Sequence, residues 1–411
     1  MTKVTVVIPV YGVEKYLPAC MDSVLGQTLR EIEIIAVDDA SPDRCGEILD
    51  GYAMQDSRVQ VVHLTENYMQ GHGRNLGLER ASGKYVYFLD SDDMVTPDAL
   101  EKLYALAEQD RLDGVIFGAR VLYENQALAR RNADFANDRN GDYRDRVYGG
   151  QELLDAFFEH FDWDCYVQKA FWRRDFLLEQ GIRFPVRTEH EDEYFSFAAC
   201  VLAERLRCIP DPYFIRRYRE ESVMTRKPHP KDFHGYFINY LRMTRLVREH
   251  GIESAGAELN IRHMIERMQQ FYPLFRREAR PEDWFKTEEE KTAYYRYVCL
   301  QDLSAYYRRK VDGIRDRIPE HARLWIYGAG VIGKKAYRAL ESEGYRIEGF
   351  LVSSTAGNPG VLFGREVRAA DTVTPGPDDV AVIAMAMGEW EDVGKVLAGR
   401  GWNYVPFGNA R

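Results

Sequence analysis

Short apolar runs alternate with helix-patterned segments through the first half of the chain. Runs rich in Val and Ile predict strands, and the segments between them repeat apolar residues at three- to four-residue spacing, which predicts helices. We expect strands at 3–11, 31–41, 59–65, 84–93 and 112–123, and helices at 13–28, 43–56, 71–82 and 96–110. Strands that are apolar throughout and separated by helices indicate a parallel sheet covered on both faces. The pattern therefore predicts an α/β fold.

The pattern changes twice further along the chain. Residues 125–146 are polar and rich in both charge signs, which predicts a flexible loop. From 227 to 315, Arg, Glu and aromatic residues recur at helical spacing, so we predict a helical connector whose basic residues form a solvated face. A second, smaller α/β unit is predicted from there to the C-terminus. The expected domains are 1–226, 227–315 and 316–411.

Composition narrows the class of protein. The chain has 411 residues, of which 45% are hydrophobic and 29% charged, and its net charge of -10 argues against a protein that coats nucleic acid. The six cysteines form no CxxC pair, so a zinc ribbon is disfavoured and reduced thiols in a cytosol are expected. The first apolar run is interrupted by Pro9 and Tyr11 and favours a core strand over a signal peptide. No run of about 18 apolar residues occurs, so we expect a cytoplasmic protein.

Three aspartates follow directly after the apolar strand expected at 84–93. In "YVYFLDSDDMVTPDALEKL" they are Asp90, Asp92 and Asp93, and a helix comes next. Like charges at this spacing repel, and a divalent cation removes the conflict. Carboxylates select Mg2+ or Mn2+, and such an ion completes its shell with substrate phosphates. The cluster favours a metal–diphosphate site. Helix N-capping is the alternative, and a calcium loop is disfavoured because Val95 stands where the turn needs glycine.

Two further acidic segments contain candidate binding or catalytic residues. Asp38 and Asp39 in "VDDAS" end another strand, where an aspartate can accept from a base N–H or a ribose hydroxyl, or can simply close an Asx-turn. Ligands of parallel sheets bind at the carboxyl ends of strands, which is where both clusters fall. Glu191 and Asp192 in "RTEHEDEYF" precede an apolar helix. There an acid could complement the helix dipole or act as a general base toward a hydroxyl.

Four segments together resemble glycosyltransferase family 2. They are "VVIPVYGVEKYLPACMDSVLGQT", "IIAVDDASPD", "GRNLGLERASGKYVYFLDSDD" and "EDEYF", in the expected order over roughly residues 3–225. The resemblance implies a GT-A fold and an inverting enzyme of the hexosyltransferase type. It also implies a nucleotide-diphosphate sugar donor, with a UDP-sugar favoured, and Mg2+ or Mn2+ as the cofactor.

The resemblance also implies roles for individual residues. The catalytic base is Asp192, with Glu191 beside it, and the metal ligands are Asp92 and Asp93. Donor-binding roles fall on residues of the other motifs and of "RYREESVMT": Pro9, Tyr11, Asp38, Asp39, Arg74, Asp90, Asp92, Arg219 and Ser222. Gly12 departs from the family, in which an asparagine commonly follows the tyrosine.

The second α/β unit contains its own motif. "IYGAGVIG" places Gly328, Gly330 and Gly333 in a GxGxxG pattern between a strand and a helix, as in dinucleotide-binding folds. The next strand ends in Ser353 and Ser354, whereas a ribose-binding acid is expected there. The unit is similar to small Rossmann-like modules beside sugar-modifying enzymes. Nucleotide binding and a structural or oligomerising role are both open.

The expected function is transfer of a sugar to a hydroxyl of a bacterial surface glycan or its lipid-linked precursor. A metal-dependent nucleotidyl- or phosphotransferase and a non-catalytic nucleotide-binding assembly module are the alternatives. The expected partners are the nucleotide sugar and the glycan acceptor, and not nucleic acid. Peripheral association with the inner face of the membrane and a homo-oligomer through the C-terminal unit are compatible with the sequence.

Overall fold

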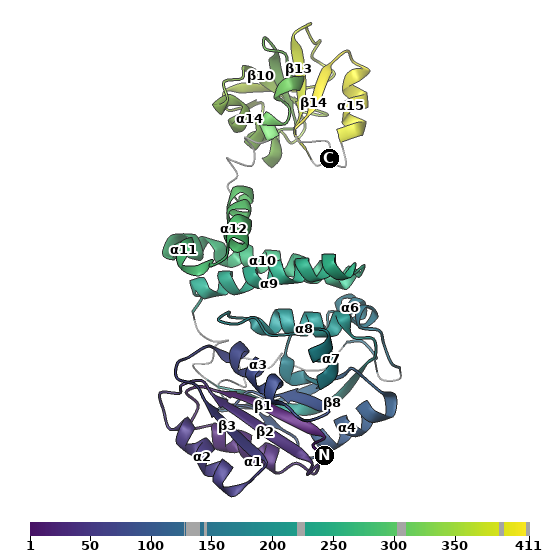
Figure 1. Cartoon of the computed structure of the whole chain (residues 1–411). Helices are drawn as coiled ribbons and strands as arrows, with labels where there is room; N and C mark the ends of the chain where they lie inside the picture. Colours follow the sequence, from purple (N-terminus) through teal and green to yellow (C-terminus); the bar gives the residue numbers. More distant parts are fainter. Residues whose placement is uncertain are drawn as a thin grey trace. The chain divides into compact units, whose positions relative to one another are not determined.

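The computed structural model describes residues 1–126, 128, 140–143, 146–219, 227–301, 310–385 and 390–407. The chain divides into two compact units, Met1–Trp284 and Phe285–Arg411 (Figure 1). The division falls inside the segment 227–315 that the sequence predicts as a connector, and most of the polar stretch 125–146 lies outside the described residues.

An eight-stranded sheet forms the centre of the first unit, in the order β3-β2-β1-β4-β7-β6-β8-β5. The strands are β1 (Val4–Val10), β2 (Ile32–Asp38), β3 (Val59–His63), β4 (Tyr85–Phe88), β5 (Met94–Val95), β6 (Gly114–Tyr123), β7 (Ala170–Arg173) and β8 (Leu206–Tyr218). Strands β1 to β4 pair in parallel, as the sequence predicts. The prediction of a wholly parallel sheet is wrong beyond these four strands. Strand β7 inserts antiparallel between β4 and β6, and β5 pairs antiparallel with β8.

Helices cover both faces of this sheet (Figure 1). They are α1 (Leu17–Leu25), α2 (Cys45–Gln55), α3 (Gln70–Arg80), α4 (Ala99–Asp110), α6 (Gly150–Glu159), α7 (Arg174–Glu179) and α8 (Glu191–Leu202). Strands β1 and β2 are buried at every position, since helices shield both of their faces. The loops after β1, β2 and β4 therefore begin at rigidly held strands and lie at one edge of the sheet.

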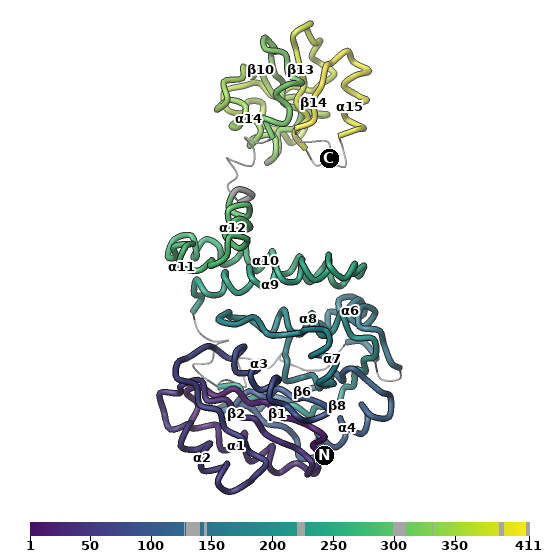
Figure 2. Tube along the Cα trace, in the orientation of Figure 1, coloured from purple at the N-terminus to yellow at the C-terminus, as the bar shows by residue number. Residues whose placement is uncertain are grey.

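A helical segment follows β8 in the chain. It consists of α9 (Pro230–His250), α10 (Ala255–Glu278) and α11 (Pro281–Trp284) in the first unit, and α12 (Glu288–Gln301) in the second. Figure 2 shows α9 and α10 running side by side. Apolar residues on their facing sides, such as Phe233 and Phe275 with ring centroids 4.6 Å apart, hold the pair together. Among the described residues, no helix has the length and apolar character needed to cross a membrane.

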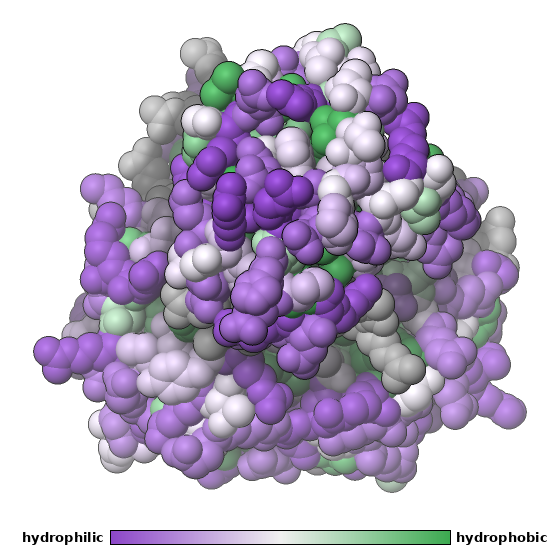
Figure 3. Space-filling model, turned by 90° about the horizontal axis from the view of Figure 1, so that it is seen from above, coloured by the Kyte–Doolittle hydropathy of each residue, from purple (hydrophilic) through white to green (hydrophobic). Residues whose placement is uncertain are grey.

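The second unit contains a six-stranded sheet in the order β11-β12-β10-β9-β13-β14. Its elements are β9 (Arg323–Tyr327), α14 (Val331–Ser342), β10 (Ile347–Val352), β11 (Val361–Leu362), β12 (Arg365–Ala369), β13 (Asp379–Ile383), α15 (Trp390–Ala398) and β14 (Asn403–Pro406). All neighbours pair in parallel except β11 and β12. Without β11, the order is third, second, first, fourth and fifth, which is the Rossmann-like arrangement that the sequence predicts. Figure 3 shows one face of the whole chain, on which hydrophilic residues predominate and apolar ones are scattered.

Candidate active site

A cavity of about 660 Å³ lies at the carboxyl ends of β1, β2 and β4. Residues from all three predicted acidic segments open onto it. The predicted site residues in its wall are Pro9, Tyr11, Asp39, Arg74, Asp90, Asp92, Asp93, Asp192 and Arg219. Parallel strands bring their loops to one edge, which explains why segments far apart in the sequence meet there.

Two other predicted site residues of the first unit, Asp38 and Glu191, do not line this cavity. Asp38 turns to His63, with 3.0 Å between Oδ2 and Nδ1, and its Oδ1 accepts a hydrogen bond from the backbone N–H of Ser41. Glu191 is buried behind the cavity wall. Ser222 lies outside the described residues.

The corner at the ends of β1 and β2 combines an acid with an exposed ring. Asp39 is buried, and its Oδ1 accepts a 2.8 Å hydrogen bond from the backbone N–H of Tyr68. Burial raises the pKa of Asp39 above the usual range of an aspartate. The Tyr11 side chain is half exposed beside it, available for stacking. Gly12 has a φ of 65°, a left-handed conformation that glycine and asparagine both tolerate, which accounts for the exchange at this position.

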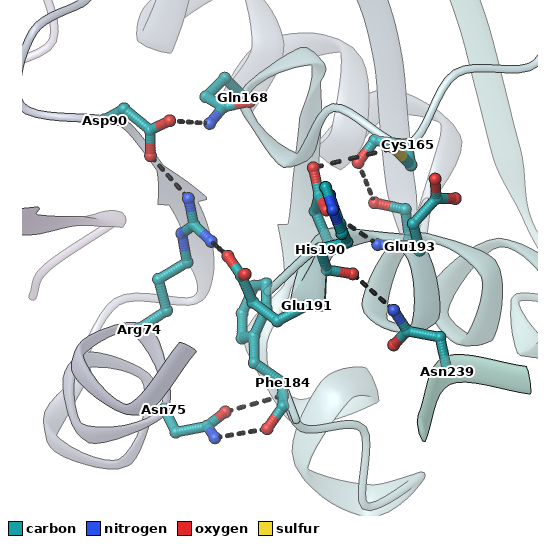
Figure 4. A network of polar contacts seen from close by, with 12 residues as sticks. Arg74, Asn75, Asp90, Cys165, Gln168, Phe184, His190, Glu191, Glu193 and Asn239 are labelled. Atoms are coloured by element: carbon teal, nitrogen blue, oxygen red, sulfur yellow. Dashed lines mark hydrogen bonds and ion pairs between the residues drawn. The ribbon is translucent and has the colours of Figure 1, made fainter. Parts of the chain in front are cut away.

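The three aspartates after β4 have different partners. Asp90 is held on both oxygens, at 2.6 Å by Nη2 of Arg74 and at 2.5 Å by Nε2 of Gln168 (Figure 4). Asp92 accepts a 2.8 Å hydrogen bond from Nε of Arg219. Asp93 accepts one of 2.7 Å from the backbone N–H of residue 217. Asp90 is thus fixed between two side chains, while the other two carboxylates each retain free acceptor capacity.

The carboxylates of Asp92 and Asp93 fit a divalent cation whose remaining ligands would be phosphate oxygens and water. Burial, followed by the charge of Asp90, raises the pKa of Asp92, and burial together with Asp92 raises that of Asp93 well above its usual range. The negative charges therefore crowd one another, and a cation would relieve them. Within the described residues, no group of three or more His, Cys, Asp and Glu side chains could hold a metal. Two carboxylates would supply part of a Mg2+ or Mn2+ shell and would leave positions for diphosphate oxygens and water.

The first turn of α8 carries the remaining acids. Glu191 is bound to Nη1 of Arg74, so one buried guanidinium joins this helix to Asp90. Asp192 faces the cavity, and its Oδ2 lies 3.7 Å from the thiol of Cys165. Burial, opposed by Arg74, raises the pKa of Glu191 to about 7. Burial and Glu193 raise that of Asp192 to about 6. Asp192 is therefore the acid of this turn that can meet a ligand directly.

Several cavity residues were not singled out from the sequence. Among them are Tyr166, Gln168, His190, Arg216, Arg217 and Lys231. The repeated arginines in "IRRYRE" are a visible signal of an anion site, and they gather beside the aspartates because β8 ends there. Gln168 comes from the short turn before β7 and has no recognisable pattern in the sequence.

The glycines of the second unit serve different purposes. A Cβ at Gly333 would lie 1.8 Å from the carbonyl oxygen of Gly328, so α14 can approach β9 only with glycine there. A Cβ at Gly330 would meet nothing within 4 Å. A second cavity, of about 520 Å³, is lined by residues at the amino ends of β13 and β14 and includes none of these glycines. The packing role of Gly333 is therefore evident, and nucleotide binding stays a prediction.

Comparison with known proteins agrees with this geometry. The family model "Glycosyl transferase family 2" matches residues 5–179. Glycosyltransferase GlyG of Streptococcus pneumoniae is 42% identical over 226 residues, which are 54% of this chain and 72% of GlyG. A poly(ribitol-phosphate) beta-glucosyltransferase of Bacillus spizizenii is 27% identical over 306 residues, covering 72% of this chain and 44% of that protein.

Solved structures share the fold. Residues 1–349 of S. aureus TarS, crystallised in complex with UDP-GlcNAc, align with a TM-score of 0.53 at 20% identity over 75% of this chain and 81% of that one. This chain spans 62%, 63% and 31% of the length of three further curated relatives. With a matching family model and a relative as similar as GlyG, the chain belongs to glycosyltransferase family 2.

Proposed function

We propose that the protein is an inverting, metal-dependent glycosyltransferase that takes a sugar from a nucleotide-diphosphate donor, preferably a UDP-sugar. One observation supports this most strongly: Asp192, Asp39 and the pair Asp92 and Asp93 open onto the same cavity. A proton acceptor, a nucleoside-reading acid and a diphosphate site are the parts that sugar transfer from a nucleotide requires.

On the donor side, Asp39 would accept from the base or ribose while Tyr11 and Pro9 flank the nucleoside. Asp92 and Asp93 would hold Mg2+ or Mn2+, which when bound supplies positive charge against the leaving diphosphate. Arg219 and its neighbours on β8 add cationic charge at the same place. Arg74 acts through Asp90, since its two amino groups already bind Asp90 and Glu191.

On the acceptor side, Asp192 takes the proton of the attacking hydroxyl. The oxygen attacks the anomeric carbon as the bond to the diphosphate breaks, so a single in-line displacement inverts that centre. A pKa raised to about 6 leaves Asp192 charged at neutral pH and makes it a stronger base than an ordinary aspartate. Glu191 supports this role by holding Arg74.

We further propose a surface glycan or its lipid-linked precursor as the acceptor, in the cytoplasm. The likeness to a poly(ribitol-phosphate) beta-glucosyltransferase supports an acceptor of this class. A nucleotidyl- or phosphotransferase would use the same acidic cluster but would leave a nucleotidyl or phosphoryl group on its product instead of a sugar. An assembly module would bind nucleotide without turnover.

Donor hydrolysis tests this proposal before the acceptor is known. The protein is incubated with UDP-, GDP-, CDP- and TDP-sugars and Mn2+, and products are followed by proton NMR. We expect release of one nucleoside diphosphate, with the sugar appearing first in the anomeric configuration opposite to that of the donor. Release of a sugar phosphate and a nucleoside monophosphate would instead indicate nucleotidyl or phosphoryl chemistry. Binding of a nucleotide without any turnover would indicate the assembly module.

A further inference from the structure

One face of α9 contacts the turn that precedes the proposed base. Asp232, Gly235, Tyr236 and Asn239 are spaced at i, i+3, i+4 and i+7 and therefore lie on the same side of the helix. We call these four residues the α9 face. Each of them meets residue 189 or 190, directly before the Glu191 and Asp192 pair.

Three contacts of the α9 face are made to His190. Nε2 of its ring lies 3.0 Å from Oδ1 of Asp232. The ring stacks on Tyr236, with centroids 4.3 Å apart and an interplanar angle of 17°. Its carbonyl oxygen accepts a 2.7 Å hydrogen bond from Nδ2 of Asn239 (Figure 4). Side chain and backbone of His190 are thus both fixed by one helix.

The fourth contact is a close backbone approach. A Cβ at Gly235 would lie 2.3 Å from the carbonyl oxygen of Glu189, so only glycine lets α9 come this near. The turn itself needs support, because His190 has a φ of 59°, an uncommon left-handed conformation for a residue with a side chain. His190 is the N-cap of α8 and makes no side-chain capping bond, so contacts from α9 take the place of a local cap.

We propose that the α9 face positions the catalytic base, and that His190 is the positioning residue through which it acts on Asp192. The inference rests on the proposed function of Asp192. It gives α9, which follows the proposed nucleotide-binding sheet in the chain, a part in the reaction. Because α9 holds the residue that begins α8, any movement of α9 changes where the carboxylate of Asp192 points in the cavity.

Electrostatics connect the same residues. Burial opposes a charge on His190, but Asp232 and Asp192 outweigh it and raise the pKa of the imidazole. The charged His190 in turn lowers the pKa of Asp192, against the larger effects of burial and Glu193. The other charged or titratable groups facing this pair are Glu189, Glu191, Arg74, Asp90, Lys231, Arg267 and Cys165. A neutral residue at 190 therefore makes Asp192 protonate at higher pH.

The test compares Asp232→Asn, His190→Asn and Gly235→Ala with Glu249→Gln, an exposed charge change on the same helix. Asn keeps the shape of Asp232 and can still cap α9, and Asn tolerates the left-handed conformation at 190. Donor turnover is measured against pH with UDP-glucose, UDP-galactose, UDP-GlcNAc and UDP-GalNAc and Mn2+, and UDP affinity is measured by calorimetry.

We expect kcat to fall about 10-fold or more in Asp232→Asn, His190→Asn and Gly235→Ala, because a small misplacement of a catalytic group is costly. Their UDP affinity and the kcat of Glu249→Gln stay within about twofold of wild type. The acid limb of the pH profile moves to higher pH in Asp232→Asn and His190→Asn. If Asp232→Asn has the wild-type kcat and the acid limb of its pH profile does not move, the inference is overturned, and the proposed function of Asp192 is not affected. No turnover by the wild type would overturn the proposed function, and the inference with it.

Discussion

Nη2 of Arg74 lies 2.6 Å from Oδ1 of Asp90, while Nη1 of the same side chain binds Glu191 (Figure 4). The guanidinium is 1% exposed, so it joins the acidic cluster after β4 to the first turn of α8 inside the protein. The proposed donor and acceptor sides are therefore fixed relative to each other by one buried cation.

Replacement of Arg74 tests this connection. Arg74→Met removes the cation from Glu191, which is buried, and from Asp90, which keeps its hydrogen bond to Gln168. We expect a loss of about 3–5 kcal/mol in the free energy of unfolding, measured with urea, since removing one member of a buried pair strands the other charge. The matched control is Lys102→Met, which breaks an exposed i,i+4 pair with Asp98 and should leave the free energy of unfolding nearly unchanged. Equal losses in the two variants would show that Arg74 has no such role.

Asp192→Asn tests the assignment of the base. The amide keeps the shape of the side chain but cannot take a proton, so we expect kcat for donor turnover to fall about 10²–10⁴-fold. Affinity for UDP should be unchanged, because Asp192 is proposed to meet the acceptor and not the nucleotide. Asp175→Asn, an exposed change in α7, is the control. Near-normal turnover by Asp192→Asn would remove this residue as the base.

The pH dependence follows from the environment of Asp192. Burial raises its pKa to about 6, and only the deprotonated form accepts a proton. Activity should therefore be full above this value and fall as pH decreases through it. The kcat profile of donor turnover, measured from pH 4 to 8, should have the midpoint of its acid limb near 6. A midpoint near 4, the range of an exposed aspartate, would contradict this environment.

Substitutions at two glycines of the second unit distinguish a packing role from a nucleotide-binding role. Gly333→Ala places a methyl group 1.8 Å from the carbonyl oxygen of Gly328, and we expect it to destabilise this unit by about 1–3 kcal/mol. Gly330→Ala enters open space and should leave stability unchanged. Thermal unfolding monitored by calorimetry distinguishes them. Equal stability of the two variants would refute the packing argument. If the turn also binds a dinucleotide, NAD should raise the melting temperature of the wild type and not that of Gly330→Ala.

Much of the first unit could be predicted from the chain alone. The strands β1 to β4 lie in apolar runs between helix-patterned segments, and the acids at their ends must meet because parallel strands end at one edge. The apolar residues of β7 are closely flanked by Lys169, Arg173 and Arg174 and give no strand pattern of their own, so the mixed half of the sheet was missed. Gln168 and His190 were missed for a related reason. Their contacts come from segments distant in sequence, and no local spacing reports what α9 or the turn before β7 will touch.

The central claim is that the cavity at the ends of β1, β2 and β4 binds a nucleoside diphosphate together with a divalent cation. Calorimetric titration of UDP with and without Mn2+, in the wild type and in Asp92→Asn, tests it most directly. We predict that Mn2+ strengthens UDP binding to the wild type and that Asp92→Asn abolishes this dependence. Binding of UDP that is indifferent both to Mn2+ and to Asp92→Asn would contradict the account and place the nucleotide elsewhere.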